Sequence, residues 1–185
     1  KFGTDNAAAY FPSATLGWVL SKENFMADAN KVALIKLRMS YGLLGSDKID
    51  DYQYIAQLNG EGTYVLNGQL INGTAIGTLP TPGISWEQSE QFDAGLDMSF
   101  FNNRLDITAD YFNKITNDLL IPNVPVSGIL GTTAPGGASP TINAGTVKNT
   151  GFEFSIGGRG GTDEKFSYRI NYNFTYLYNE VTAVN

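Results

Sequence analysis

Residues 86–120 contain two stretches in which apolar and polar side chains alternate, and this alternation constrains the fold more than any other feature. Residues 92–100 have apolar side chains at even positions and residues 105–111 have them at odd positions, with polar side chains or glycine between. Because successive side chains of a β-strand point to opposite faces, each stretch is predicted to be a strand with one apolar face. Asn102 and Asn103 between them tolerate the left-handed conformation of a tight turn, so the segment predicts a β-hairpin.

The polar face of this hairpin carries four carboxylates, which would be costly to bury in the core of a soluble β-sandwich. They are Asp93, Asp97, Asp106 and Asp110. Each arm also has roughly the 9–11 residues that a tilted strand needs to cross a bilayer. We therefore predict an all-β fold, an antiparallel up-and-down meander that forms part of a large transmembrane β-barrel.

Four further strands are predicted at residues 10–20, 35–44, 151–156 and 166–178, which gives about six in total. In the last of these, every even position is apolar or aromatic, whereas Leu177 is the only such residue at the odd positions. Six strands cannot close a membrane barrel, and an open edge in lipid would leave backbone groups unpaired. We therefore expect further strands outside this sequence.

The connections between the predicted strands alternate between short and long. Short turns are expected near residues 21–30, 101–103 and 158–165, and long surface loops at about residues 45–85 and 121–145. Alternate connections of an antiparallel meander lie at opposite ends of the sheet. Both long loops are therefore predicted to lie at one end, as in outer-membrane barrels.

The composition argues against several functional classes. The net charge is -6 and the 12 lysines and arginines are scattered, so a nucleic-acid partner is not expected. The absence of cysteine and histidine excludes disulfides, thiolate and imidazole metal sites and Ser-His-Asp catalysis within these residues, and no cofactor is predicted.

No apolar run approaches the roughly 18 residues of a transmembrane helix, so strands would carry any membrane role. Because the chain opens at Lys1 without an initiator methionine, we expect a fragment of a longer protein.

The apolar faces of the predicted strands supply the residues expected to contact lipid. We predict lipid-facing positions at Phe92, Leu96, Phe100, Leu105, Ile107, Tyr111, Phe152, Phe154, Tyr168, Tyr172 and Phe174. The tyrosines of the first long loop have two interpretations, since their rings could stack on a sugar or peptide ligand or pack within the loop. These substrate-binding candidates are Tyr52, Tyr54 and Tyr64.

Three other patterns share features with a cation site, a glycosidase pair and a phosphate-binding loop, but none of them predicts such a site. Asp47, Asp50 and Asp51 are oxygen ligands that a hard cation such as Ca²⁺ could take, but their spacing matches no complete calcium loop, so we interpret them as solvated loop charges. The hairpin carboxylates meet the spacing of a glycosidase pair, but a hydrated barrel interior explains them without catalysis. The glycines at residues 157–161 lack the lysine and helix of a phosphate-binding loop and are interpreted as a turn.

Four sequence blocks carry a resemblance to a known family. They read FPSATLGWVLSKENFM at residues 11–26, KLRMSYGLLG at 36–45, the WE-plus-hairpin segment at 86–120 and INAGTVKNTGFEFSI at 142–156. In this order and at similar separations, the blocks resemble the late barrel strands of the SusC/RagA-type TonB-dependent transporters of Gram-negative outer membranes. The resemblance covers most of the chain.

The resemblance implies a function that the residues alone do not supply. It implies that residues 1–185 are part of one multi-pass barrel domain in the cell outer membrane, whose plug domain and TonB box lie outside this segment. The whole protein would import glycans or peptides with energy from TonB-ExbB-ExbD and with a SusD-like lipoprotein partner, and it would not be an enzyme. Two alternatives remain at this point: a passive outer-membrane porin, and a soluble carbohydrate-binding or adhesin β-sandwich.

Overall fold

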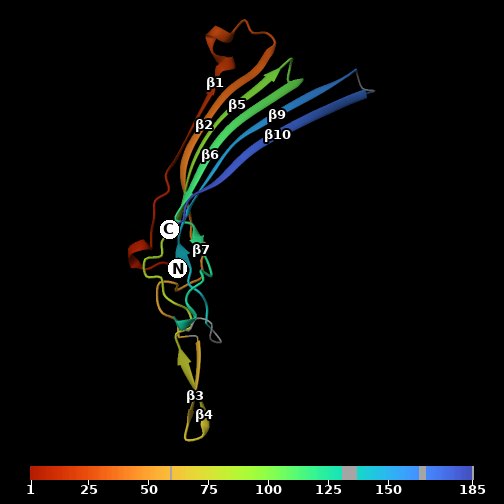
Figure 1. Cartoon of the computed structure of the whole chain (residues 1–185). Coiled ribbons are helices and arrows are strands. Elements are labelled where there is room, and N and C mark those ends of the chain that lie inside the picture. The colour runs from red at the N-terminus through yellow and green to blue at the C-terminus, as the bar shows by residue number, and fades with distance from the viewer. Residues whose placement is uncertain (59, 131–136, 163–165, 185) are drawn as a thin grey trace.

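The computed structural model describes residues 1–58, 60–130, 137–162 and 166–184. Its main element is one antiparallel sheet of six strands in the order β1-β2-β5-β6-β9-β10 (Figure 1). Because neighbours in the sheet follow one another along the chain, the sheet is an up-and-down meander, and the predicted all-β fold class is confirmed. The strands are β1 Ser13–Val19, β2 Val32–Ser46, β5 Glu87–Phe100, β6 Leu105–Asn117, β9 Thr146–Thr162 and β10 Phe166–Ala183.

The two long connections contain smaller elements. In the first, β3 Gly60–Leu66 and β4 Gln69–Ala75 form a separate hairpin, and in the second, β7 Leu120–Ile121 pairs with β8 Ile142–Asn143. Four short 3-10 helices complete the described elements, and they are η1 Thr4–Asn6, η2 Leu20–Lys22, η3 Asn24–Met26 and η4 Gly128–Leu130. None of the helices in the described ranges has the length and apolarity required to cross a membrane.

The strand register divides the sheet into an apolar face and a polar face. One row of cross-strand partners on the apolar face consists of Trp18, Leu37, Leu96, Ala109, Phe154 and Phe174. The adjacent row, on the polar face, consists of Gly17, Arg38, Gly95, Asp110, Glu153 and Thr175. All the positions predicted to face lipid share the apolar face, whereas their contact with lipid stays a prediction.

No second layer of the described chain covers the apolar face. Leu16 is 68% exposed, Trp18 47% and Phe174 48%. The buried hydrophobic residues among those described are Ile84 and Ala144, and both lie in the long connections. A β-sandwich would bury the apolar face against a second sheet. This sheet therefore lacks the core that a soluble sandwich requires.

Both long connections leave the sheet at the same end, as predicted, and we call it the loop end (Figure 1). The connections at residues 20–31 and 101–104 lie at the opposite end, which we call the turn end. The β9–β10 pairing also begins at the turn end, with Phe166 opposite Thr162. The two chain termini lie toward the loop end (Figure 1).

The glycine-rich segment at residues 157–161 is a strand, so its prediction as a turn was wrong. β9 continues through it to Thr162, and Gly157 and Gly161 pair with Asn171 and Ser167 of β10. The missing side chains leave room for those of β10, because a Cβ at Gly160 would lie 2.6 Å from the Tyr168 hydroxyl. The end of the predicted turn, residues 163–165, lies outside the described residues.

The other strands differ from the prediction only at their ends. β1 begins at Ser13, not at residue 10, because Pro12 has no N–H to donate to the sheet; its carbonyl accepts a 2.9 Å hydrogen bond from Leu43 N. β1 ends before Leu20, which begins η2. β2 and β9 extend beyond residues 35–44 and 151–156 at both ends.

The β5–β6 turn uses the predicted left-handed asparagines. The φ angles of Phe101, Asn102 and Asn103 are 54°, 58° and 61°. The left-handed Phe101 was not predicted, because a bulky side chain disfavours that region. Its N–H donates a 2.8 Å hydrogen bond to Lys31 O, which joins this turn to the connection before β2.

Phe112 interrupts the polar face and lies against a glycine of the next strand. Its register partner in β9 is Gly151, whose partner in β10 is Leu177. A Cβ at Gly151 would overlap the Phe112 ring and would lie 2.6 Å from Tyr176 O. The aromatic ring therefore fills the space that the glycine leaves, as aromatic side chains do over glycines in other sheets.

We predict that Gly151→Ala destabilises the intact protein by about 1–3 kcal/mol, because the added methyl group must displace the Phe112 ring and the neighbouring backbone. Gly158→Ala is the matched control in the same strand, since nothing lies within 4 Å of its Cβ position. Its effect should stay within about 0.5 kcal/mol. Urea unfolding in detergent, followed by circular dichroism, measures both variants. Equal midpoints for the two would contradict this packing.

Candidate functional site

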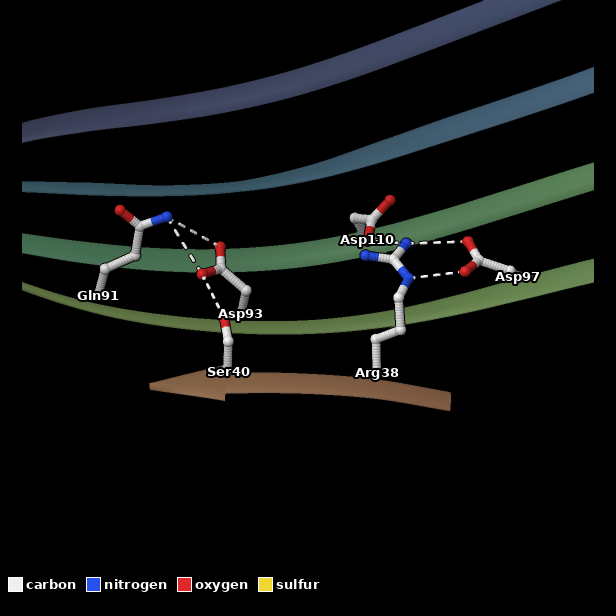
Figure 2. A network of polar contacts seen from close by, with 6 residues as sticks. All are labelled: Arg38, Ser40, Gln91, Asp93, Asp97 and Asp110. Carbon is white, nitrogen blue, oxygen red and sulfur yellow. Dashed lines mark hydrogen bonds and ion pairs between the residues drawn. The ribbon is translucent and has the colours of Figure 1, made fainter. Parts of the chain in front are cut away.

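An arginine on the polar face joins three strands (Figure 2). Arg38 of β2 donates from Nε to Asp97 Oδ2 at 2.7 Å and from Nη2 to Asp97 Oδ1 at 2.9 Å. The same Nη2 lies 2.9 Å from Asp110 Oδ1 of β6. The arginine side chain is 39% exposed and the two carboxylates are 28% and 29% exposed. The guanidinium therefore balances the negative charge of two partly exposed carboxylates on neighbouring strands.

Gly95 makes this reach across the sheet sterically feasible. It lies between Arg38 and Asp110 in the same cross-strand row, and the two outer strands are about 10 Å apart at a spacing of about 4.8 Å per strand. A Cβ at Gly95 would overlap the Asp110 carboxylate and lie 2.8 Å from the Arg38 guanidinium carbon. A larger residue at this position would therefore separate the ion pair.

The other carboxylates of the polar face of the hairpin also have hydrogen-bond partners. Asp93 accepts bonds from Ser40 Oγ at 3.0 Å and from Gln91 Nε2 at 3.1 Å (Figure 2). Asp106 accepts a 2.6 Å bond from Ser99 Oγ. The carboxylates that were weighed as a catalytic pair are therefore held in separate polar contacts along the face. This arrangement suits a hydrated, charged lining.

At the loop end, the two long connections bind one another. Thr78 forms isolated β-bridges with Gln57 of the first connection and Ala138 of the second. Thr81 Oγ1 donates a 2.8 Å bond to Thr141 O, which again crosses between the connections. Long loops without such contacts are usually mobile. These contacts make the described parts of the two loops one folded unit, which we call the loop unit.

The side chain of Asn143 attaches this loop unit to the start of β5. Its Oδ1 accepts a 2.7 Å bond from Ser85 N, while its Nδ2 donates to Ser85 O at 2.9 Å and to Asp118 O at 3.0 Å. One amide thereby satisfies backbone groups from both long connections.

The segment before β1 packs against the same region. Phe2 and Phe11 lie 5.0 Å and 5.5 Å from Trp86 between ring centroids. Trp86 Nε1 donates a 2.9 Å bond to Asn6 O, and Asn6 Nδ2 donates a 3.0 Å bond to Ile84 O. Ile84 has no exposed surface. The small core of the described chain is therefore in the loop unit.

The three loop tyrosines are not equivalent. Tyr52 has a positive φ of 62° and is 59% exposed, while Tyr64 lies on β3 and is 53% exposed. Tyr54 is half-buried, and its ring lies over Gly3, 3.6 Å from the position that a Cβ would occupy there. Tyr54 therefore packs against the segment before β1, and ligand contact by the three tyrosines stays a prediction.

The acidic residues of the first loop are partly or fully exposed. Asp47 lies 3.4 Å from Lys1 Nζ and its side chain is 49% exposed, while Asp50 and Asp51 are exposed. In the part of the chain that the structure describes, no group of three or more histidine, cysteine or acidic side chains is placed to hold a metal ion.

The strand predicted at residues 35–44 contains Arg38, but its partners on β5 and β6 were not predicted. Alternation alone places each of these residues on one face of its own strand, and the register of β2, β5 and β6 then brings Arg38, Gly95 and Asp110 into one row. Phe112 was also missed, although the adjacent aromatic pair Tyr111-Phe112 breaks the alternation opposite a glycine.

Comparisons with known proteins agree with this architecture. Residues 1–185 match the family model described as TonB dependent receptor-like, beta-barrel. The chain is 34% identical over 185 residues to TonB-dependent receptor P3 of Formosa agariphila, covering 100% of this chain and 18% of the relative. It is 33% identical over 188 residues to TonB-dependent receptor SusC of Bacteroides thetaiotaomicron, again covering 100% of this chain and 18% of the relative.

A solved structure of the RagAB peptide transporter superposes with a TM-score of 0.84 and 32% sequence identity, covering 99% of this chain and 19% of that chain. The chain thus spans less than a fifth of the length of these relatives. The family match over the whole chain agrees with the six-stranded meander, which has one apolar face, one polar face and both long loops at one end. The chain belongs to the TonB-dependent receptor β-barrel family of the outer membrane, in its SusC/RagA group.

Proposed function

We propose that this chain forms part of the barrel of an active outer-membrane importer that takes up bulky nutrients with energy derived from TonB. The observation that carries the proposal is a single sheet with one apolar face, one polar face and both long loops at one end. The relatives named as TonB-dependent receptors support the energy source. The plug and the TonB-contacting segment would be supplied by parts of the protein outside residues 1–185.

The apolar face is proposed to contact outer-membrane lipid. At about 3.3 Å per residue, the stretch from Phe92 to Phe100 extends about 26 Å along the strand, or about 20 Å across the membrane at a tilt of about 40°. This is close to the apolar band of about 25 Å that such barrels present. Tyr41 and Tyr178, at its loop-end margin, are 46% and 51% exposed, which suits an interfacial aromatic girdle.

The polar face is proposed to line the water-filled interior. Arg38, Asp97 and Asp110 are partly exposed there and are paired with one another. Because these carboxylates are held by hydrogen-bond and ionic partners, they support binding and passage of a hydrated substrate rather than bond cleavage. We accordingly propose a transporter without enzymatic activity.

The loop unit is proposed to contact the substrate and a SusD-like lipoprotein partner. Glycans or peptides are the substrate classes, and the description of RagAB as a peptide transporter supports the second of these. The β3–β4 hairpin projects beyond the rest of the loop unit (Figure 1), and Val65 and Leu70 near its turn are 68% and 69% exposed. An isolated two-stranded hairpin is only marginally stable in water, which supports a partner at this surface.

Uptake in living cells tests the proposed activity. Deletion of the full gene should abolish accumulation of a labelled substrate from a panel of glycans and peptides, and its return should restore uptake. In a strain without TonB, uptake should fall to the level of the deletion although the protein remains in the outer membrane. Undiminished uptake without TonB would identify a passive porin and contradict the proposal.

Two neighbouring positions of β9 test the assignment of the faces. Phe154→Arg places a charge on the apolar face near the middle of the band, where it should cost about 2–4 kcal/mol. Ser155→Arg places the same charge on the polar face and should cost less than about 1 kcal/mol. Urea unfolding of the barrel in lipid vesicles measures both costs. A larger penalty for Ser155→Arg would reverse the proposed orientation.

The ion-pair network is tested at β2. Arg38→Gln leaves Asp97 and Asp110 without their shared cation and should destabilise the protein by about 1–2 kcal/mol, less at high salt because the group is partly exposed. Lys114→Gln, a cation of the same face whose register partners are Gln91 and Asn149, is the control and should change stability by less than about 0.5 kcal/mol. Indistinguishable urea midpoints for the two variants would show that the network contributes no stability.

A further inference from the structure

Three of the four arginines of the chain form one row on the polar face at the turn end. Arg159 of β9 pairs in register with Arg169 of β10, and its N–H donates a 2.8 Å bond to Arg104 O, just before β6. All three line a single open hollow of about 620 Å³. They are the charged residues that line it, and its other lining residues are Asn102, Gly160, Gly161, Phe166, Ser167 and Tyr168.

This concentration of cations is unfavourable without an anion. Neighbouring strands are about 4.8 Å apart, and like charges placed directly opposite one another destabilise a sheet. The ion pairs found within the described ranges join Lys1 to Asp47 and Arg38 to Asp97 and Asp110, so none of them neutralises the row. The chain as a whole is acidic, with a net charge of -6, which makes the presence of three arginines around one hollow distinctive.

The residue type and its orientation indicate the ligand chemistry. Guanidinium groups present several N–H donors in a plane, which matches the two oxygens of a carboxylate or the oxygens of a phosphate. Arg159 Nε donates to Asn103 O in the β5–β6 turn, which holds this guanidinium beside Arg104. Within the described ranges, the hydrogen bond from Nε is the side-chain bond that Arg159 makes, and no described group accepts from its terminal nitrogens.

We propose that Arg104, Arg159 and Arg169 form an oxyanion-binding site that takes a phosphate or carboxylate group at the turn end of the polar face. The site is separate from the loop unit and lies at the opposite end of the sheet. Its ligand is either a free oxyanion or a carboxylate of another part of the full-length protein, since both present the same acceptor geometry.

Binding of inorganic phosphate to the full-length protein in detergent tests the site without requiring transport, so failure of the proposed importer activity would not affect the result. Isothermal titration at constant ionic strength, against chloride, measures affinity. Each of Arg104→Gln, Arg159→Gln and Arg169→Gln should weaken phosphate binding about tenfold or more, the loss expected for one charge-assisted contact. Lys114→Gln, a cation of the same face that does not line the hollow, should leave affinity within about twofold.

A carboxylate already in the site gives a different signature. Phosphate then does not bind the wild-type protein, and each arginine variant lowers the thermal midpoint more than Lys114→Gln does, with a difference that shrinks as salt rises. Two results would overturn the proposal. One is equal behaviour of the arginine variants and Lys114→Gln in both measurements. The other is phosphate binding that appears only in the double variant Asp163→Asn, Glu164→Gln. That result would mean that the two acidic residues between β9 and β10 already neutralise the arginines.

Discussion

Backbone pairing of six strands produces one sheet with an apolar face and a polar face, and the positions of the loops and the side-chain contacts follow from it. In the middle of the six strands every second side chain is apolar and the others are mostly polar or small, so the two faces require different environments. The sheet accordingly has no covering layer in the described chain, and its buried hydrophobic residues, Ile84 and Ala144, lie in the loop unit. The proposed placement, with lipid on the apolar side and water on the polar side, would satisfy both faces at once.

Small residues give the polar face its organisation. Gly95 allows the Arg38 guanidinium to reach Asp110 across an intervening strand, and Gly151 leaves the space that Phe112 occupies. The face is therefore crossed by side-chain contacts between strands in addition to the backbone ladder. At the loop end, Asn143 and Thr78 perform a comparable task by joining the two long connections to one another and to β5.

Alternation predicted the fold class, the shared apolar face and the gathering of the long loops, because side-chain period and connection order follow directly from strand geometry. It did not predict what glycine does inside a strand. Residues 157–161 were interpreted as a turn because glycine favours turns, whereas here its missing side chain admits Tyr168 and Asn171 from β10. The Arg38 network also required the exact register of three strands, which a single strand's pattern does not contain.

Spin labels on β10 test whether its even-numbered side chains face lipid and its odd-numbered side chains face water. Single cysteines at residues 168 to 176 can each carry a nitroxide in the full-length protein in lipid vesicles, after any cysteine outside residues 1–185 is replaced by serine; residues 1–185 contain no cysteine. We expect that collision with dissolved oxygen peaks at even positions and that collision with a water-soluble nickel chelate peaks at odd positions, with a period of two. Accessibility that lacks this period, or that peaks in the opposite phase, would contradict it.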